Sequence, residues 1–282
     1  MNIVEYRPAR RVDVAGLLRR VWGAPPSVDE LAWLYERNPV RPASVLLGEE
    51  GDRVVGVVAM SFVRMAVEGR ELEVGMPIHL ATDPGFRGRG VFSELQGRNE
   101  ERARELGIKL LLIVPNAASA RVLKARLGWQ ALEPLRIWAR PKLVRGRQRA
   151  SPIERFADVH PLAGGADRVL RDAEWLNWRF VDSPARYTAL GSHGNGNGYA
   201  VAGRRGRLGV VAAVEGDLVR DAAAAAGGPV VVAAPPSGAR RRYAAAGFLP
   251  THRSLIVLGK SLDRSQRVPG RPQFELGDLD FV

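Results

Sequence analysis

The order of hydrophobic and polar positions predicts a mixture of strands and helices. Apolar stretches between turn residues are typical of strands, and apolar residues three or four apart are typical of helices. The expected strands cover residues 45–47, 54–62, 72–82 and 108–114, with a further one leading to residue 139, and the expected helices cover residues 27–37, 91–106 and 117–127. Ser27 and Glu30 have the spacing of a capping box, which marks the start of the first of these helices. This alternation predicts an α/β fold, or an α+β fold, built on a mixed sheet.

The chain also contains an internal repeat. The pattern L-x-W-x-[YF]-x-x-[NS]-P occurs at 31–39 and again at 176–184, and a second match relates 120–129 to 239–248. Two matches in the same order indicate a duplication. The offsets, 145 and 119 residues, differ, so the second copy is shorter. Its glycine-rich stretch at 194–198 is typical of a hairpin turn.

Composition then excludes several classes of protein. The chain has 282 residues and no cysteine, which excludes disulfides, thiolate metal sites and cysteine nucleophiles. Its four histidines are far apart in sequence, so we expect no metal site. No apolar run approaches the length that crosses a bilayer, and the N-terminal residues predict a strand followed by arginines rather than a signal peptide. We therefore expect a soluble cytoplasmic protein.

The net charge of +12 calls for an explanation. A nucleic acid, an anionic membrane surface or a phosphate-bearing ligand could each balance it. Half of the excess lies in the segment 136–149, which has six basic residues and no acidic one. Such a run is typical of a solvated linker, and composition alone does not choose between the partners.

The segment 80–91 carries the strongest chemical signal. It predicts a strand, then the loop Arg87-Gly88-Arg89-Gly90, then a helix. Glycines let the backbone approach a ligand closely, and the N–H groups at a helix start bind anions. Arginine side chains add charge-assisted hydrogen bonds to phosphate oxygens. The loop therefore predicts a pyrophosphate site, with a glycine-rich surface turn as the alternative. It has neither the G-K-[ST] of a P-loop nor the G-x-G-x-x-G of a dinucleotide site.

These residues resemble the GCN5-related N-acetyltransferase (GNAT) superfamily. The family's acetyl-CoA loop has the form [QR]-x-x-G-x-[GA] between a strand and a helix, and residues 87–92 follow it except that Phe92 replaces a small residue. The segments 115–119 and 127–129 are similar to the family's N-x-x-[SA] and [LY]-G-[FW] motifs. The repeat looks like that of tandem members, some of which acylate amino sugars.

The resemblance implies two tandem GNAT-like domains, the second shortened and lacking the CoA loop. We expect the first domain at 1–141, a basic linker at 142–152, the second domain at 153–262 and a C-terminal tail at 263–282. The co-substrate would be acetyl-CoA or another acyl-CoA, with no metal. The residues that the resemblance assigns to its binding are Leu80, Ala81, Thr82, Arg87, Gly88, Arg89, Gly90, Val91, Asn116 and Ser119.

In such enzymes the amine attacks the thioester directly, so the protein must supply a base. His79 is our first candidate, because the pKa of an unperturbed histidine lies near the working pH, and Glu73 is our second. A hydrogen-bonded structural histidine and a surface glutamate are the alternatives. At the position where the family often has a tyrosine acid, this chain has Lys124, whereas the second copy has Tyr243.

Three residues outside the first copy are candidates for binding the acceptor. Trp178 could stack on a substrate, although its helical spacing is also typical of a packing residue. Asp278 and Asp280 could bind an ammonium or hydroxyl groups if the tail folds back, and a solvated tail is the alternative.

The sequence thus favours an acyl-CoA-dependent N-acyltransferase that acts on a primary amine of a small polar molecule such as an amino sugar, including nucleotide-linked acceptors. A CoA-binding module without catalysis and a nucleic-acid-binding protein are the alternatives. We expect no membrane partner, and a homodimer stays open.

Overall fold

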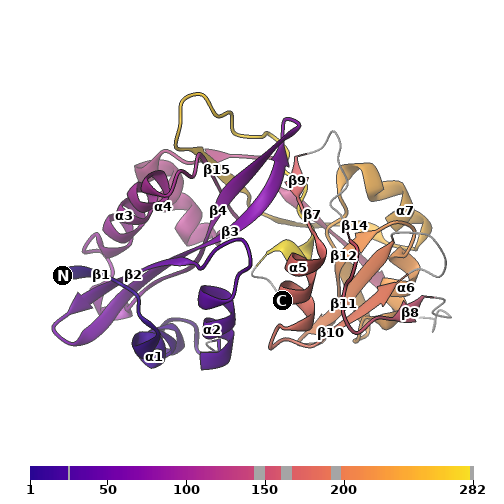
Figure 1. The fold of residues 1–282 in the computed structure, drawn as a ribbon, viewed down its shortest axis with the longest axis horizontal. Helices are drawn as coiled ribbons and strands as arrows, with labels where there is room; N and C mark the ends of the chain where they lie inside the picture. The colour runs from indigo at the N-terminus through magenta and orange to yellow at the C-terminus, as the bar shows by residue number, and fades with distance from the viewer. Residues whose placement is uncertain (25, 143–149, 160–166, 192–197, 280–282) are drawn as a thin grey trace. The chain divides into compact units, whose positions relative to one another are not determined.

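The computed structural model describes the whole chain except residues 25, 143–149, 160–166, 192–197 and 280–282. It divides into two compact units (Figure 1). Unit 1 contains Met1–Met65, Arg70–Leu132 and Ile256–Gly270, whereas unit 2 contains Ala66–Gly69, Glu133–Leu255 and Arg271–Val282. The expected two-domain α/β architecture is confirmed.

Unit 1 is built on a mixed sheet with the strand order β1-β2-β3-β4-β5-β15-β6. The strands are β1 (Asn2–Glu5), β2 (Ser44–Glu50), β3 (Arg53–Val67), β4 (Arg70–Thr82), β5 (Leu110–Ile113), β6 (Gln130–Ala131) and β15 (Leu258–Ser261). β4 and β5 are parallel, and β15 runs antiparallel to both β5 and β6. Strands β3 to β5 are mostly buried, which agrees with their long apolar runs.

Helices cover both faces of this sheet, with α3 and α4 on one side and α1 and α2 on the other (Figure 1). Their bounds are η1 (Pro8–Arg10), α1 (Arg11–Trp22), α2 (Val28–Glu36), η2 (Pro84–Phe86), α3 (Val91–Glu105) and α4 (Ala117–Leu127). The predicted capping box is present, because the Ser27 hydroxyl accepts from the Glu30 amide and the Glu30 carboxylate accepts from the Ser27 amide. Helix α4 ends at Gly128, which has a left-handed conformation.

The parallel ladder between β4 and β5 is short, and this opens the sheet. Among the described residues, Val74 pairs with Leu110 and Gly75 with Leu111. β4 nevertheless continues for seven more residues, to Thr82. The backbone of β4 from residue 76 onward is therefore available to something other than β5.

Unit 2 repeats the plan with the strand order β14-β7-β13-β12-β11-β10-β8. The strands of this sheet are β7 (Leu135–Pro141), β8 (Ser151–Pro152), β10 (Tyr187–Gly191), β11 (Tyr199–Arg205), β12 (Leu208–Glu215), β13 (Val230–Ala233) and β14 (Leu249–Leu255). The short strand β9 (Arg168–Val169) is not part of it. Its helices are α5 (Ala173–Leu176), η3 (Asn177–Val181), α6 (Val219–Ala225), η4 (Ser237–Ala239), α7 (Arg240–Ala245) and η5 (Leu276–Asp278). β12 and β13 form the parallel pair, as β4 and β5 do in unit 1.

Two strands belong to a different unit from the one that the predicted domain ranges give them. β7, expected to close the first domain, pairs with β13 and β14 in the sheet of unit 2. β15, expected within the second domain, pairs with β5 and β6 in the sheet of unit 1. Residues 271–279 of the expected tail belong to unit 2. Sequence separation does not reveal such an exchange, because each strand has a normal strand pattern wherever it pairs.

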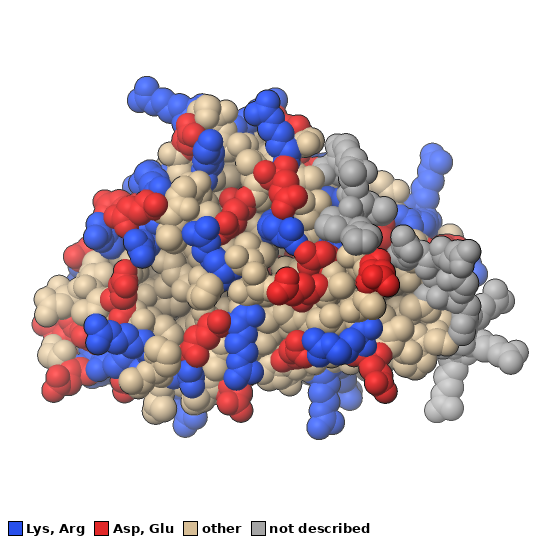
Figure 2. Space-filling view, in the orientation of Figure 1, with Lys and Arg blue, Asp and Glu red and all other residues tan. Residues whose placement is uncertain are grey.

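Charged side chains are mixed on the visible surface. Figure 2 shows Lys and Arg interspersed with Asp and Glu, and many of them form ion pairs, such as Arg98 with Glu101 and Arg102 with Glu105 on α3. Most of the predicted basic linker, residues 143–149, lies outside the described residues. In the described part of the chain, no helix combines the length and apolar character needed to cross a membrane.

Candidate active site

The loop after β4 has the conformation that its glycines predicted. Gly88 and Gly90 have φ values of +79° and +84°, in the left-handed region that favours glycine. A Cβ at either position would meet no atom within 4 Å, so the backbone conformation, not crowding, requires glycine there. Arg87 and Arg89 are exposed, and the Arg89 guanidinium lies 5.0 Å from the centre of the Phe86 ring.

Gly90 is also the N-cap of α3, a helix of 15 residues, and no side chain caps this end. The first amide groups of a helix point outward and carry a partial positive charge. This uncapped helix start therefore has the charge and the free amide groups that an anion requires, and the exposed Arg87 and Arg89 come just before it in the chain. Phe92, the departure from the family motif, packs against the core under α3 and leaves the loop clear.

Asp83 holds this loop in place, and the sequence alone did not point to it. Its carboxylate accepts hydrogen bonds from the Arg20 side chain at 2.8 Å, the Arg53 side chain at 2.7 Å and the Gly85 amide at 3.1 Å. Burial raises the pKa of this carboxyl, but the hydrogen bonds from Arg20, Arg53 and Gly85 outweigh that effect and bring the pKa below its ordinary value. The Asp-Pro-Gly turn was a visible signal, but the arginines come from distant segments.

His79 lies where β4 has left β5, and its backbone is strained. Its φ is +49°, a left-handed value inside a strand. The side chain is buried, and its Nδ1 lies 2.7 Å from the hydroxyl of Tyr35. The ring of Trp22 lies 5.5 Å from the imidazole, and Trp22 is 43% exposed. Strain of this kind persists only where the surroundings hold it, and it is common at functional sites.

Tyr35 is the second residue that the sequence alone did not point to. It belongs to the repeated W-x-[YF] pattern, in which its counterpart is Phe180, so the pattern indicated packing alone. Tyr35 is almost fully buried, and its ring lies edge-on to that of Tyr6 at 5.3 Å. Only the first copy has the hydroxyl group, and that hydroxyl contacts the candidate base.

Glu73, the other candidate base, forms an ion pair. Its carboxylate oxygens lie 2.6 and 3.0 Å from Arg41 nitrogens. Burial raises the pKa of the Glu73 carboxyl, and the opposing effect of Arg41 does not fully cancel this rise. The residue precedes Val74, where β4 still pairs with β5. His79 therefore lies in the part of β4 that extends beyond the ladder with β5, whereas Glu73 lies next to the start of that ladder.

The remaining predicted CoA-binding residues border the opening. Residues 80–82 lie in β4 beyond the ladder with β5, as pantetheine binding would require. Asn116 is the N-cap of α4, where its side-chain oxygen accepts from the Ser119 amide at 2.9 Å. Lys124, on the same helix, is exposed.

The acceptor-binding candidates of the second copy lie elsewhere. Trp178 is buried in unit 2, with its ring 6.2 Å from that of Trp175. The side chain of Asp278 has no exposed surface and pairs with Arg171 at 2.6 Å. Asp280 lies outside the described residues. Among the described residues, no group of three or more acidic or histidine side chains could hold a metal ion.

Comparison with known proteins agrees with this geometry. Residues 3–132 match the family model of an acetyltransferase (GNAT) domain. The match assigns an acetyltransferase (GNAT) domain to this part of the chain, which makes up most of unit 1. The comparison with curated proteins found no match.

Solved structures share the fold of the whole chain at low sequence identity. A probable N-acyltransferase from Enterococcus faecalis V583 is 11% identical, with 93% of this chain and 72% of that chain covered and a TM-score of 0.66. GCN5-related N-acetyltransferases from Kribbella flavida (16% identity, 93% and 71% covered, TM-score 0.61) and Anabaena variabilis (10% identity, 93% and 73% covered, TM-score 0.61) are similar.

Proposed function

We propose that unit 1 acetylates a primary amine of a small polar acceptor such as an amino sugar, with His79 as the base. The observation that carries this proposal is the position of His79. It is buried and strained on the part of β4 that has left β5, beside Tyr35 and a half-exposed Trp22.

Acetyl-CoA fits the residues on this side of the sheet. The uncapped start of α3 with Arg87 and Arg89 would hold the pyrophosphate, and the backbone of residues 80–82, on the edge of β4 beyond its ladder with β5, would hold the pantetheine amides. The thioester supplies an activated acyl group. The chain's own task is to position the amine, take its proton and stabilise the developing oxyanion.

The step is a direct transfer. The acceptor arrives as an ammonium and loses one proton to the His79 imidazole, and the amine nitrogen then forms a bond to the thioester carbon. The oxyanion collapses as the carbon–sulfur bond breaks, the acylated nitrogen releases its second proton, and CoA leaves as the thiolate, which takes up that proton. Tyr35, held against Nδ1, fixes the orientation of the imidazole ring.

The exposed indole ring of Trp22 favours an acceptor that contains a sugar ring over a linear one. A half-exposed indole beside the base offers an apolar face on which the C–H face of a sugar could stack, while the hydroxyl groups stay in contact with water. A linear amine would gain less from this surface.

A CoA-release assay with acetyl-CoA and a panel of amines tests the proposal. We expect turnover of amino sugars to exceed that of linear amines of equal charge, and Trp22→Ala to raise KM for amino sugars while Trp22→Phe retains most of the affinity. Turnover of no amine by a protein that binds acetyl-CoA would instead indicate a binding module without catalysis.

A further inference from the structure

Unit 2 has an opening in its sheet like that of unit 1, but it is filled. The parallel ladder between β12 and β13 ends at Val210 and Val232, while β12 continues to Glu215. Leu276, from the C-terminal segment, is fully buried and packs against Val210 and Ala234, one on each of the diverging segments. The chain thus places its own residues where the sheet opens.

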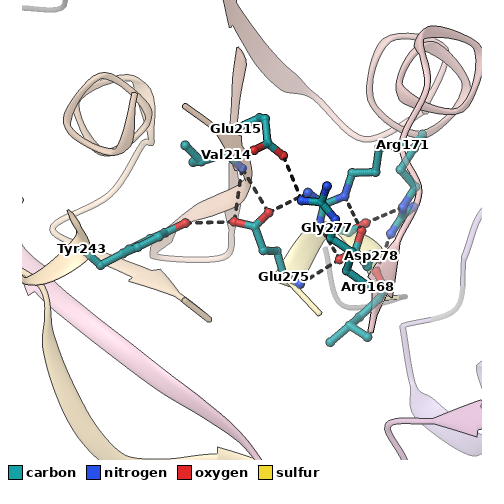
Figure 3. Close-up of polar contacts among 10 residues, drawn as sticks. Arg168, Arg171, Val214, Glu215, Tyr243, Glu275, Gly277 and Asp278 are labelled. Carbon is teal, nitrogen blue, oxygen red and sulfur yellow. Dashed lines mark hydrogen bonds and ion pairs between the residues drawn. The ribbon is translucent and has the colours of Figure 1, made fainter. Parts of the chain in front are cut away.

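The polar contacts of this segment are those of a bound ligand (Figure 3). The Glu275 carboxylate accepts from the backbone amide of Val214 at 3.2 Å and from the Tyr243 hydroxyl at 3.0 Å. Val214 lies on β12 beyond the ladder, so its amide corresponds to those that β4 leaves free in unit 1. Tyr243 stands at the position where the first copy has Lys124.

Two arginines of unit 2 bind the rest of the segment. Arg171 forms two parallel hydrogen bonds with Asp278, at 2.8 and 2.6 Å, and a third with Glu275 at 2.7 Å. Arg179 donates to the backbone carbonyls of Gly277, at 2.8 Å, and Leu279. Bidentate Arg–carboxylate pairs combine strength with geometric specificity.

The segment also fits sterically at its centre. A Cβ at Gly277 would lie 2.7 Å from the Phe180 ring and 2.8 Å from the Ala212 carbonyl oxygen. Position 277 therefore admits only glycine without displacement of its neighbours. Charge, backbone contacts and shape thus specify one short sequence, Glu-Leu-Gly-Asp at 275–278.

We propose that unit 2 is a peptide-binding module whose ligand is the chain's own segment Phe274–Leu279, bound in the opening that corresponds to the acyl-CoA site of unit 1. Unit 2 thereby keeps the open sheet of an acyltransferase domain but uses it to hold an acidic peptide. Within the described part of the chain, the opening of unit 1 is then the one left for acyl-CoA.

Peptide binding in trans tests this proposal with the full-length protein. The variant Glu275→Gln/Asp278→Asn weakens the hold on the internal segment, and Gly277→Ala does so by a steric clash that leaves both carboxylates in place. A fluorescent peptide with the sequence of residues 273–279 should bind both variants saturably and at least tenfold more tightly than it binds the wild type, whose site is filled. A peptide carrying the Gln and Asn changes should bind at least tenfold more weakly.

Hydrogen exchange of the wild type provides a measurement that needs no variant. The amides of residues 275–279 and of Val214 should exchange together, at one slow rate. Equal peptide binding by wild type and variants, binding by neither variant, or fast exchange of the segment while Val214 stays protected would each overturn the proposal. None of these readouts depends on whether unit 1 transfers acetyl groups.

Discussion

At the scale of single residues, the account depends on His79 and its strained backbone. A left-handed residue inside a strand is costly, and Asn tolerates that conformation better than most side chains. His79→Asn therefore removes the base while preserving the backbone. Since general-base catalysis contributes about 10²- to 10⁴-fold, we expect kcat to fall by at least about 100-fold at neutral pH with an unchanged Kd for acetyl-CoA. Steady-state kinetics and calorimetry check this. A variant that retained more than a tenth of the activity would exclude His79 as the base.

The variant Tyr35→Phe tests whether the Tyr35 hydroxyl positions the His79 imidazole for catalysis. The ring stays in the core while the hydroxyl that contacts Nδ1 is lost. We expect a smaller fall in kcat than for His79→Asn, together with a displaced pH–rate profile, because the tyrosine acts through the imidazole. An unchanged profile would indicate that the hydroxyl only fills space.

The ion pairs of Asp83 predict how the free energy of unfolding depends on pH. The folded-state pKa of this carboxyl lies below its ordinary value, so its pairing stabilises the fold at neutral pH, and this contribution is lost as the pH falls below about 4. We expect Asp83→Asn to lower the free energy of unfolding by about 1–3 kcal/mol at pH 7, and the difference from the wild type to shrink toward pH 3. Urea unfolding at a series of pH values measures this. A difference that grows with acidity would contradict the assignment.

At the scale of elements, two glycines have opposite roles in α3, one inside the helix and one at its N-cap. Gly97 lies in the middle of the helix without a positive φ, whereas Gly90 caps its start at φ +84°. Gly97→Ala should stabilise the protein by about 0.5–1 kcal/mol, because alanine loses less backbone entropy in a helix. Gly90→Ala should destabilise it by about 1–2 kcal/mol, because a left-handed Cβ is strained. Thermal melting of the two variants measures these changes in stability. Equal changes in the two variants would contradict the left-handed conformation of Gly90.

The elements of unit 1 also show what a sequence can predict. The capping box of α2, the bounds of α4 and the turn from β4 into α3 depend on residues close together in the chain, and local rules identified them. The contact between Tyr35 and His79 and the anchoring of Asp83 by Arg20 and Arg53 join residues 30 to 63 positions apart. No local pattern marks such pairs, because each partner has an ordinary packing or surface pattern by itself.

At the scale of the whole molecule, the exchanged strands make each unit depend on distant parts of the chain. β15 supplies Lys260, whose ammonium lies 2.5 Å from the buried Glu100 carboxylate and also donates to the Leu127 carbonyl. The same carboxylate accepts from the Trp129 indole at 2.8 Å. The predicted division at residue 141 would leave this glutamate without its cation.

Lys260→Met tests this dependence. Removing one partner of a buried pair leaves an uncompensated charge, which costs about 3–5 kcal/mol, whereas Lys260→Met/Glu100→Gln should recover most of the loss. Chemical unfolding of both variants measures the coupling. Equal stability of the single variant and the wild type would contradict the role of β15 in unit 1.

The central claim is that the loop of unit 1 binds acetyl-CoA, and titration calorimetry tests it most directly. The wild type should bind one acetyl-CoA per chain. Gly90→Asp should weaken binding at least tenfold, because its carboxylate would cap α3 and repel the pyrophosphate. The control Arg70→Glu changes an exposed charge at the other end of β4, and it should bind as the wild type does. No binding by the wild type, or equal affinity in Gly90→Asp, would contradict the account.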